Sequence, residues 1–204
     1  MIDIPTLIRQ NGLVSDQVDA DELTTVLLEL EQTHGKEGAV VEFGCYVGTT
    51  SLYIRRVLNA YSDAREFHVY DSFEGLPEKS TEDLSPVGEQ FKAGELSVSR
   101  KQFESEFKKA RLQLPVIHKG WFSDLTPANI PDRIRFAFLD GDFYDSVKTP
   151  LKLIESVLTP GATIIVDDYA NEALPGAARA TDEWCRAKGL TVRVVHSLGV
   201  IHLP

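Results

Sequence analysis

The sequence has few of the residue types that mark disulfide-linked and thiol-based proteins. Its 204 residues include only two cysteines, Cys45 and Cys185, and a single methionine. A small secreted domain held by disulfide bonds needs more cysteine pairs, so we expect two reduced, buried thiols. No histidine is placed by the sequence to activate Cys45, which disfavours a cysteine nucleophile.

Long apolar runs and an excess of basic residues are missing too. No stretch approaches the roughly 20 apolar residues of a membrane-spanning helix, and residues 1–5 lack the pattern of a signal peptide. We therefore expect a soluble, cytoplasmic protein without a membrane partner. Lysines and arginines number 21 against 31 acids, which gives a formal charge of −10. Because the basic residues are also scattered, we do not expect nucleic acid as a substrate.

The length and the 43% hydrophobic content suit one domain over residues 1–204. We expect residues up to about 18 to be irregular, within an N-terminal segment 1–37 whose helix begins at Asp19 or Asp21. The link at 197–199 is too short for a crossover helix, so the last two strands should pair antiparallel. Apolar patterns predict further helices at 51–58, 99–114, 146–158 and 173–188, and strands at 39–43, 66–71, 115–118, 138–139, 164–166, 191–196 and 200–203.

Two of the apolar runs end abruptly in acidic residues. The run at 138–139 leads into Asp140-Gly141-Asp142, and the run at 164–166 leads into Asp167-Asp168. A right-handed crossover through the helix at 146–158, stopped by residues 159–161, makes the two strands parallel. If they are neighbours, their acids converge on one edge of the sheet.

Four carboxylates at two strand ends carry charge that is costly to leave unpaired. A hard divalent cation is the simplest occupant. Capping of helices and turns would explain one acid but not a convergent cluster. For Asp142 the alternatives are a general base and an acid that orients ligands or caps the following helix.

A junction of strand, glycine loop and helix follows residues 39–43. Gly44 and Gly48 bound a loop whose free N–H groups, at the positive end of a helix, suit an anion. Tyr46 stands where the dinucleotide fingerprint has a glycine, and no lysine followed by serine or threonine completes a P-loop, which disfavours NAD, FAD and nucleoside triphosphates. The cap of that helix is expected among Thr49, Thr50 and Ser51.

Asp71 ends the predicted strand at 66–71, roughly twenty residues after the loop, where an acid can accept from ribose hydroxyls. Capping of the turn that follows explains Asp71 equally well. A loop suited to a small anion, followed by a ribose acid, suggests S-adenosylmethionine. Trp121 and Phe122 are either adenine-stacking or core aromatics. The long polar segment at 78–98 is either a mobile cover for the site or disorder without function.

Several strings resemble the macrocin O-methyltransferase (TylF-type) family of class I S-adenosylmethionine-dependent methyltransferases. The resemblance spans about residues 38–186, and its most specific parts are Asp-Ser-Phe-Glu-Gly-Leu-Pro at 71–77 and Asp-Gly-Asp at 140–142. It implies a Rossmann-like α/β fold with a mostly parallel seven-stranded sheet, a C-terminal antiparallel hairpin and helices on both faces. The other matching segments are 41–44 with Gly48, 120–122 with Asp124, Tyr144 and Ser146, and 167–169 with Pro175 and Gly176.

Carried over to this chain, the resemblance implies a catalytic site and a cofactor site. Asp140, Asp167 and Asp168 would bind Mg²⁺ or another divalent cation, and Asp142 would be the general base. A homodimer or higher homo-oligomer is expected as well. The cofactor would be held by Glu42, Gly44, Tyr46, Gly48, Asp71, Ser72, Gly120, Trp121 and Asp140.

Three functions fit this pattern. The first is a metal-dependent O-methyltransferase that acts on a hydroxyl of a small molecule, such as a sugar or glycosylated natural product. The second is a catechol-type O-methyltransferase acting on an aromatic diol. The third is a non-catalytic S-adenosylmethionine-binding domain, against which the presence of all four acids argues.

Overall fold

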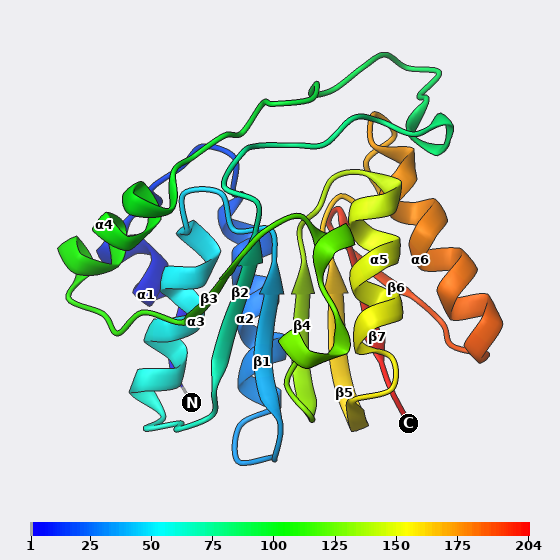
Figure 1. The fold of residues 1–204 in the computed structure, drawn as a ribbon. Helices are drawn as coiled ribbons and strands as arrows, with labels where there is room; N and C mark the ends of the chain where they lie inside the picture. Colours follow the sequence, from blue (N-terminus) through cyan, green and yellow to red (C-terminus); the bar gives the residue numbers. More distant parts are fainter. Residues whose placement is uncertain (1) are drawn as a thin grey trace.

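Seven strands form one sheet in the order β3-β2-β1-β4-β5-β7-β6 in the computed structural model, which describes residues 2–204 (Figure 1). Neighbours from β3 to β5 pair in parallel, whereas β7 is antiparallel to both β5 and β6. The mostly parallel sheet with a C-terminal hairpin is confirmed. The strands are β1 (Ala39–Phe43), β2 (Phe67–Asp71), β3 (Val116–Lys119), β4 (Ile134–Leu139), β5 (Leu158–Val166), β6 (Arg193–Val195) and β7 (Leu198–His202).

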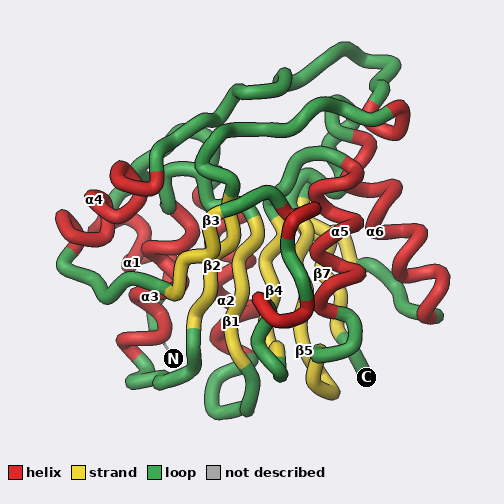
Figure 2. The backbone as a smooth tube through the Cα atoms, viewed as in Figure 1, coloured by secondary structure: helices red, strands yellow, loops and turns green. Residues whose placement is uncertain are grey.

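Helices cover both faces of this sheet (Figure 2). Alternate residues of each strand point to opposite faces, so Val40 packs in the core under α1 to α4 and Val41 in the core under α5 and α6. Burial on both faces explains why the central strands read as unbroken apolar runs. The helices are α1 (Ile4–Asn11), α2 (Ala20–Gln32), α3 (Thr49–Ala60), α4 (Arg100–Ala110), α5 (Tyr144–Ile154) and α6 (Pro175–Lys188), with short 3-10 turns η1 (Thr81–Asp83), η2 (Phe122–Asp124) and η3 (Pro127–Asn129).

The expectation of an irregular start to the chain is wrong, because α1 is a helix. The Asp3 side chain caps it by accepting from the Thr6 N–H at 3.0 Å, and Ile4 and Ile8 are buried in the core. Local signals for this helix are present in the sequence, namely Asp3 as an N-cap, proline in the first turn, and Ile4, Leu7 and Ile8 at helical spacing. The start of α2 is confirmed, since Asp19 accepts from the Asp21 N–H at 2.8 Å.

Two other helices end earlier than predicted. α4 stops at Ala110 because Arg111 adopts the left-handed conformation with φ 56°. α5 ends at Ile154, and Leu158 already pairs with Ile134 of β4 in the sheet. Residues 159–161, expected to stop a helix, therefore lie within β5.

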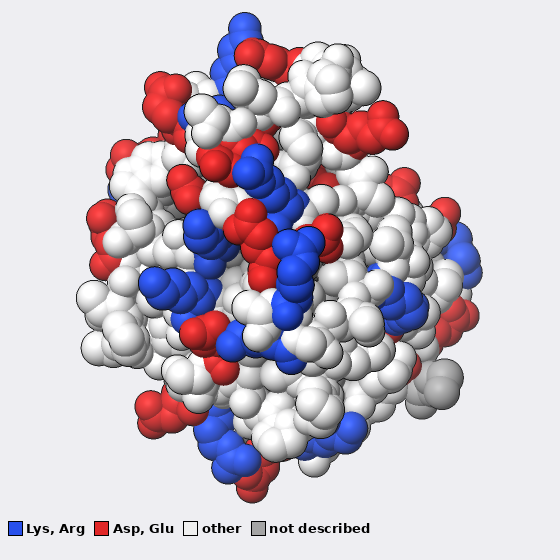
Figure 3. Space-filling model, turned by 90° about the vertical axis from the view of Figure 1, so that its right-hand side faces the viewer, with Lys and Arg blue, Asp and Glu red and all other residues white. Residues whose placement is uncertain are grey.

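Both cysteines are free and buried, as expected. Across residues 2–204, every helix is too short or too polar to cross a membrane. On the side where α6 lies, basic and acidic side chains are interspersed (Figure 3), with Lys188 3.0 Å from Glu155 and Arg179 3.5 Å from Glu183. That face offers no continuous basic surface.

A row of stacked rings runs from β1 across β2 to β3. Phe43 stacks on Tyr70, and Tyr70 on His118, both with centroids 4.4 Å apart, and His68 Nδ1 lies 3.0 Å from His118 Nε2. Burial, together with nearby His68, lowers the pKa of His118. The uncharged ring is therefore the form that this packing favours.

A lowered pKa means that the unfolded chain binds a proton at His118 more readily than the folded chain does. Stability is therefore lost as the pH falls through the unfolded value of about 6.5. We expect His118→Phe, which can still stack on Tyr70, to flatten the fall in unfolding free energy between about pH 7.5 and about pH 5.5. Urea unfolding across that range measures the effect. Exposed His196→Asn is the control, and an unchanged pH dependence in His118→Phe would contradict the expectation.

Candidate active site

A pocket of about 390 Å³ opens at the carboxyl ends of the parallel strands. The segment at 78–98 passes over these strand ends (Figure 1). The loops after β1 to β5 line the pocket, together with the start of α5 and residues near the start of α2. Every residue predicted to bind cofactor or metal, and the predicted base Asp142, lines this pocket except Gly48. A Cβ at Gly48 would lie 2.8 Å from the Phe103 ring, so this glycine serves packing against α4.

The glycine loop passes very close to the end of β4. Gly44 has φ +85°, and a Cβ there would lie 1.9 Å from the carbonyl oxygen of Asp140. Only glycine fits, because any side chain would push the loop away from the acid-bearing turn. The close approach places the loop after β1 beside the turn after β4.

The predicted side-chain cap of α3 is wrong. The N-cap is Gly48, without a side-chain hydrogen bond, and the Ser51 hydroxyl instead donates to Glu42 at 2.5 Å. Burial raises the pKa of Glu42 to about 8, and the Ser51 bond opposes that rise. Thr49 Oγ1, by contrast, is buried at the pocket without a hydrogen-bond partner among the described residues. An unpartnered buried hydroxyl is costly, and a polar ligand group would satisfy it.

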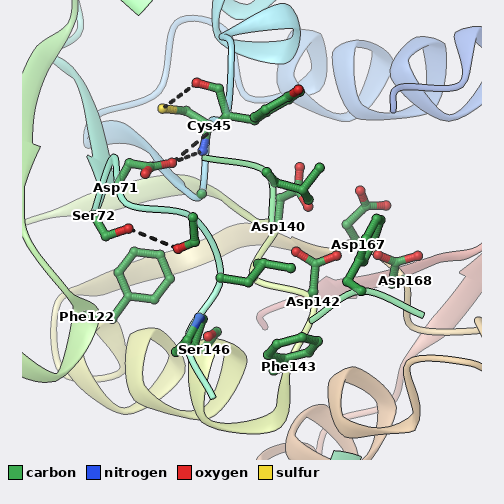
Figure 4. Close-up of a pocket in the computed structure, with 18 of the residues that line it drawn as sticks. Cys45, Asp71, Ser72, Phe122, Asp140, Asp142, Phe143, Ser146, Asp167 and Asp168 are labelled. Carbon is green, nitrogen blue, oxygen red and sulfur yellow. Dashed lines mark hydrogen bonds between the residues drawn. The ribbon is translucent and has the colours of Figure 1, made fainter. Parts of the chain in front are cut away.

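Asp71 holds the glycine loop and the turn after β2 together. Its Oδ2 accepts from the N–H groups of Cys45 at 2.8 Å and Tyr46 at 3.2 Å, and its Oδ1 accepts from Phe73 at 2.6 Å (Figure 4). The turn-capping alternative is thus confirmed. Contact with a ribose stays a prediction, supported by the position of Asp71 and Ser72 in the pocket wall.

The acids after β4 and β5 do converge. Leu139 pairs with Val166 in parallel, and the Asp167 N–H donates to the Leu139 carbonyl at 2.8 Å, so the two turns start side by side. Oxygens of Asp140, Asp167 and Asp168 all lie within 4.8 Å of one another. Asp142 stands beside them (Figure 4), with 6% of its surface exposed.

These carboxyl groups repel one another in a half-buried place. Burial, and next the neighbouring acids, raise the pKa of Asp140 and of Asp167 well above the ordinary value. Burial and the charge of Asp168 raise the pKa of Asp142 to about 7. Burial also raises the pKa of Asp168, against a hydrogen bond from Asn171. Three hard oxygen donors with no basic partner in the described pocket wall fit a divalent cation.

Three further residues of the site were not predicted from the sequence. Glu22 of α2 lines the pocket and accepts from the Ser197 N–H at 3.1 Å. Asp83 of η1 lines the pocket as well. Asn171 Nδ2 donates to Asp168 Oδ1 at 2.9 Å, and its spacing three residues after an acid is a local signal that could have been read. Phe122 packs edge-on against Phe43 at 5.6 Å, which favours a packing role.

Comparison with known proteins agrees with this geometry. The family model described as macrocin O-methyltransferase (TylF) matches residues 20–200. This chain belongs to that family. The family expected from the motifs is therefore confirmed, and the match extends beyond both ends of the segment that carried them.

Curated relatives of this chain are O-methyltransferases by name. The 8-demethyl-8-(2,3-dimethoxy-alpha-L-rhamnosyl)-tetracenomycin-C 4'-O-methyltransferase of Streptomyces olivaceus is 36% identical over 146 residues, which cover 68% of this chain and 56% of the relative. The mycinamicin III 3''-O-methyltransferase of Micromonospora griseorubida is 29% identical over 171 residues, which cover 79% of this chain and 65% of the relative. In each case the matched part is less than two thirds of the relative's length.

The fold also matches solved structures of class I O-methyltransferases. The O-methyltransferase NovP superposes with a TM-score of 0.76 at 25% sequence identity, over 91% of this chain and 81% of that chain. The Rossmann-like α/β fold expected for the family is thereby confirmed.

Mutual repulsion in the acid cluster leads to a stability prediction. In the presence of chelator at about pH 8, Asp167→Asn should raise the free energy of unfolding by about 1 kcal/mol or more, because it removes one of three crowded charges without changing shape. Thermal or urea unfolding measures this. Asp132→Asn, an exposed acid at the opposite end of β4, should show no such gain. A less stable Asp167→Asn protein would mean that the carboxylates do not repel one another as their spacing implies.

Proposed function

We propose that this chain is an S-adenosylmethionine-dependent O-methyltransferase that uses a divalent cation and acts on a hydroxyl group of a sugar or glycosylated natural product. The observation that carries the proposal is the joining of two features in one pocket. A glycine loop with an unpartnered buried hydroxyl lies directly beside four convergent carboxyl groups. Membership of the macrocin O-methyltransferase family supports the same activity.

The cofactor would lie along the loops after β1, β2 and β3. The Thr49 hydroxyl would donate to its carboxylate, because the N–H groups of Gly44, Cys45 and Tyr46, expected to be free, already donate within the protein. Asp71 and Trp121 lie along the wall for its nucleoside. When bound, S-adenosylmethionine supplies a methyl group on a positively charged sulfur. Acids lining the pocket also favour a cationic sulfonium electrostatically.

The remaining acids divide between a metal site and a proton acceptor. Asp140, Asp167 and Asp168 would hold Mg²⁺ or another divalent cation, whose charge lowers the pKa of a hydroxyl placed against it. Asp142 lies outside that set of three but beside it in the pocket wall, and it would be the general base. Asp142 would take the proton of the acceptor hydroxyl, whose oxygen would receive the methyl group as its bond to the cofactor's sulfur breaks.

The charge of the pocket restricts the acceptor. Among the described residues, no lysine, arginine or histidine lines it. An acceptor with phosphate groups would meet repulsion there, whereas neutral sugar hydroxyls would not. The charged lining residues are all acids: Glu22, Glu42, Asp71, Glu78, Asp83, Asp140, Asp142, Asp145, Asp167 and Asp168.

Removal of the metal tests the mechanism. We expect S-adenosylmethionine to bind in calorimetry, and methyl transfer from labelled cofactor to stop with chelator and return with Mg²⁺. Asp168→Ala should lower the rate about 100-fold or more, because it removes a ligand of the cation. Asp132→Ala is the control.

Two outcomes would reject different parts of the proposal. Transfer that is indifferent to chelator and to Asp168→Ala would exclude the metal but leave a methyltransferase. Failure to bind S-adenosylmethionine at high micromolar concentration would reject the function itself. Binding without transfer to any acceptor would favour a non-catalytic binding domain.

Acceptor charge is tested with a matched set of compounds. A neutral glycoside, the same sugar as its nucleotide diphosphate, and a catechol are compared by kcat/KM. We expect the glycoside to exceed the nucleotide sugar by about tenfold or more, because like charges oppose binding. The gap should narrow as salt rises, since ions screen repulsion. Preference for the nucleotide sugar would contradict the proposal, and preference for the catechol would favour the aromatic alternative.

A further inference from the structure

Residues 78–98, called the strap below, pass over the carboxyl ends of the strands toward α6 and return to α4 (Figures 1 and 2). Lys79 Nζ donates to the Gln90 carbonyl at 2.8 Å and joins the two arms of the strap. Ser85 Oγ donates to the Glu172 carbonyl at 2.7 Å, at the far end. The strap is thus docked on the loop between β5 and α6.

Asp83 is the buried acid of the strap, with 3% of its surface exposed. Its Oδ2 accepts from the Ser80 N–H at 2.8 Å and the Ser80 hydroxyl at 2.7 Å, and its Oδ1 accepts from the Tyr144 N–H at 2.6 Å. No lysine or arginine within residues 2–204 pairs with it in an ion pair. The charge is instead met by backbone N–H groups.

Two helices begin at this carboxylate. Tyr144 is the first residue of α5, whose N-cap Phe143 gives no side-chain hydrogen bond. A Cβ at Gly176, in the first turn of α6, would lie 1.9 Å from Asp83 Oδ1, so only glycine admits the carboxylate there. The positive ends of both helices favour an anion at this place. The contact also gives a physical reason for the Pro175-Gly176 pair in the sequence.

The N–H that Asp83 binds belongs to Tyr144, two residues after the proposed base Asp142. Asp142 has φ 60°, and the Phe143 N–H donates back to the Gly141 carbonyl at 2.6 Å, which makes a γ-turn centred on Asp142. Such a turn is strained for a residue other than glycine and persists only where its surroundings hold it. The bond from the Tyr144 N–H to Asp83 fixes the residue where this turn enters α5.

The strap also reaches the metal-site turn. Asn171 Nδ2 lies 3.2 Å from Gln90 Oε1 of the strap and 2.9 Å from Asp168 Oδ1. The Lys79 ammonium lies over the Phe143 ring, 5.3 Å from its centroid. The cover of the pocket and the turns that carry its acids therefore share direct contacts.

We propose that Asp83 is a positioning residue for the methyl transfer, which holds the turn bearing Asp142 in shape by accepting the Tyr144 N–H and fastens the strap over the pocket. The inference rests on the proposed function, because it assigns Asp142 a role in that reaction. Asp83 itself does not touch the reacting atoms. Its removal lets the γ-turn relax and the strap lift together.

The test compares two variants at one position. Asp83→Ala loses the bond to Tyr144 and should lower kcat by about 10- to 100-fold, because a small misplacement of a catalytic group is enough. Affinity for S-adenosylmethionine in calorimetry should change little. Asp83→Asn keeps an oxygen for the Tyr144 N–H and should retain most of the activity. Glu89→Gln, an exposed acid on the same strap, is the control.

Hydrogen exchange read by mass spectrometry gives an answer independent of activity. Peptides covering the strap and residues 141–146 should exchange faster in Asp83→Ala than in the wild type or in Glu89→Gln. Unchanged exchange, or equal kcat in wild type, Asp83→Ala and Asp83→Asn, would overturn the inference. If Asp83→Ala fails to fold, Ser80→Ala, which frees only the strap side of Asp83, should still speed exchange in the strap. A wild type without methyl transfer would refute the proposed function, while the exchange data would still decide the role of Asp83.

Discussion

Repulsion among half-buried carboxyl groups is the constraint on which the rest of this structure depends. Asp140, Asp167 and Asp168 are brought within 4.8 Å by the parallel pairing of β4 with β5, in a place where no basic side chain of the described chain compensates them. An arrangement of that kind weakens the fold unless a cation binds there. Tolerance of such a cluster is typical of a functional site rather than of a core designed for stability.

The glycine loop after β1 lies at the same edge of the sheet. Gly44 allows the loop after β1 to touch the backbone of Asp140, and Asp71 ties that loop to the end of β2. The cofactor side and the acid side of the pocket therefore share a rigid wall. A methyl donor bound on one side and a hydroxyl bound on the other would meet without any large movement of the sheet.

The strap covers the same edge and contacts the turns that carry the acids. Asp83 connects it to the starts of α5 and α6, and Asn171 connects it to Asp168. These contacts tie the strap to the turns that carry Asp142 and Asp168. Entry of an acceptor and assembly of the catalytic turn would then be linked through the same bonds.

The sequence by itself determined the strands, most helices, the antiparallel hairpin and the acids of the site, because each is written in local patterns. Apolar runs that end in Asp140 and Asp167 gave both the strand ends and the chemistry. The prediction missed α1 although its N-cap Asp3 and its apolar residues at helical spacing are local signals. Local patterns also misplaced the end of α5, since pairing of Leu158 with β4 overrides its helical spacing.

Only the tertiary structure decided which distant residues complete the site. The spacing of Ser80 and Asp83 is that of a capping box, but nothing in the sequence connects Asp83 with the start of α5. Its role depends on a hydrogen bond that it accepts from the N–H of Tyr144, 61 residues away. Gly48 is the opposite case. Its place in the loop predicts a cofactor contact, but in the folded protein it packs against the Phe103 ring. Local patterns specify elements, whereas contacts between elements are set by packing, which no single stretch of sequence contains.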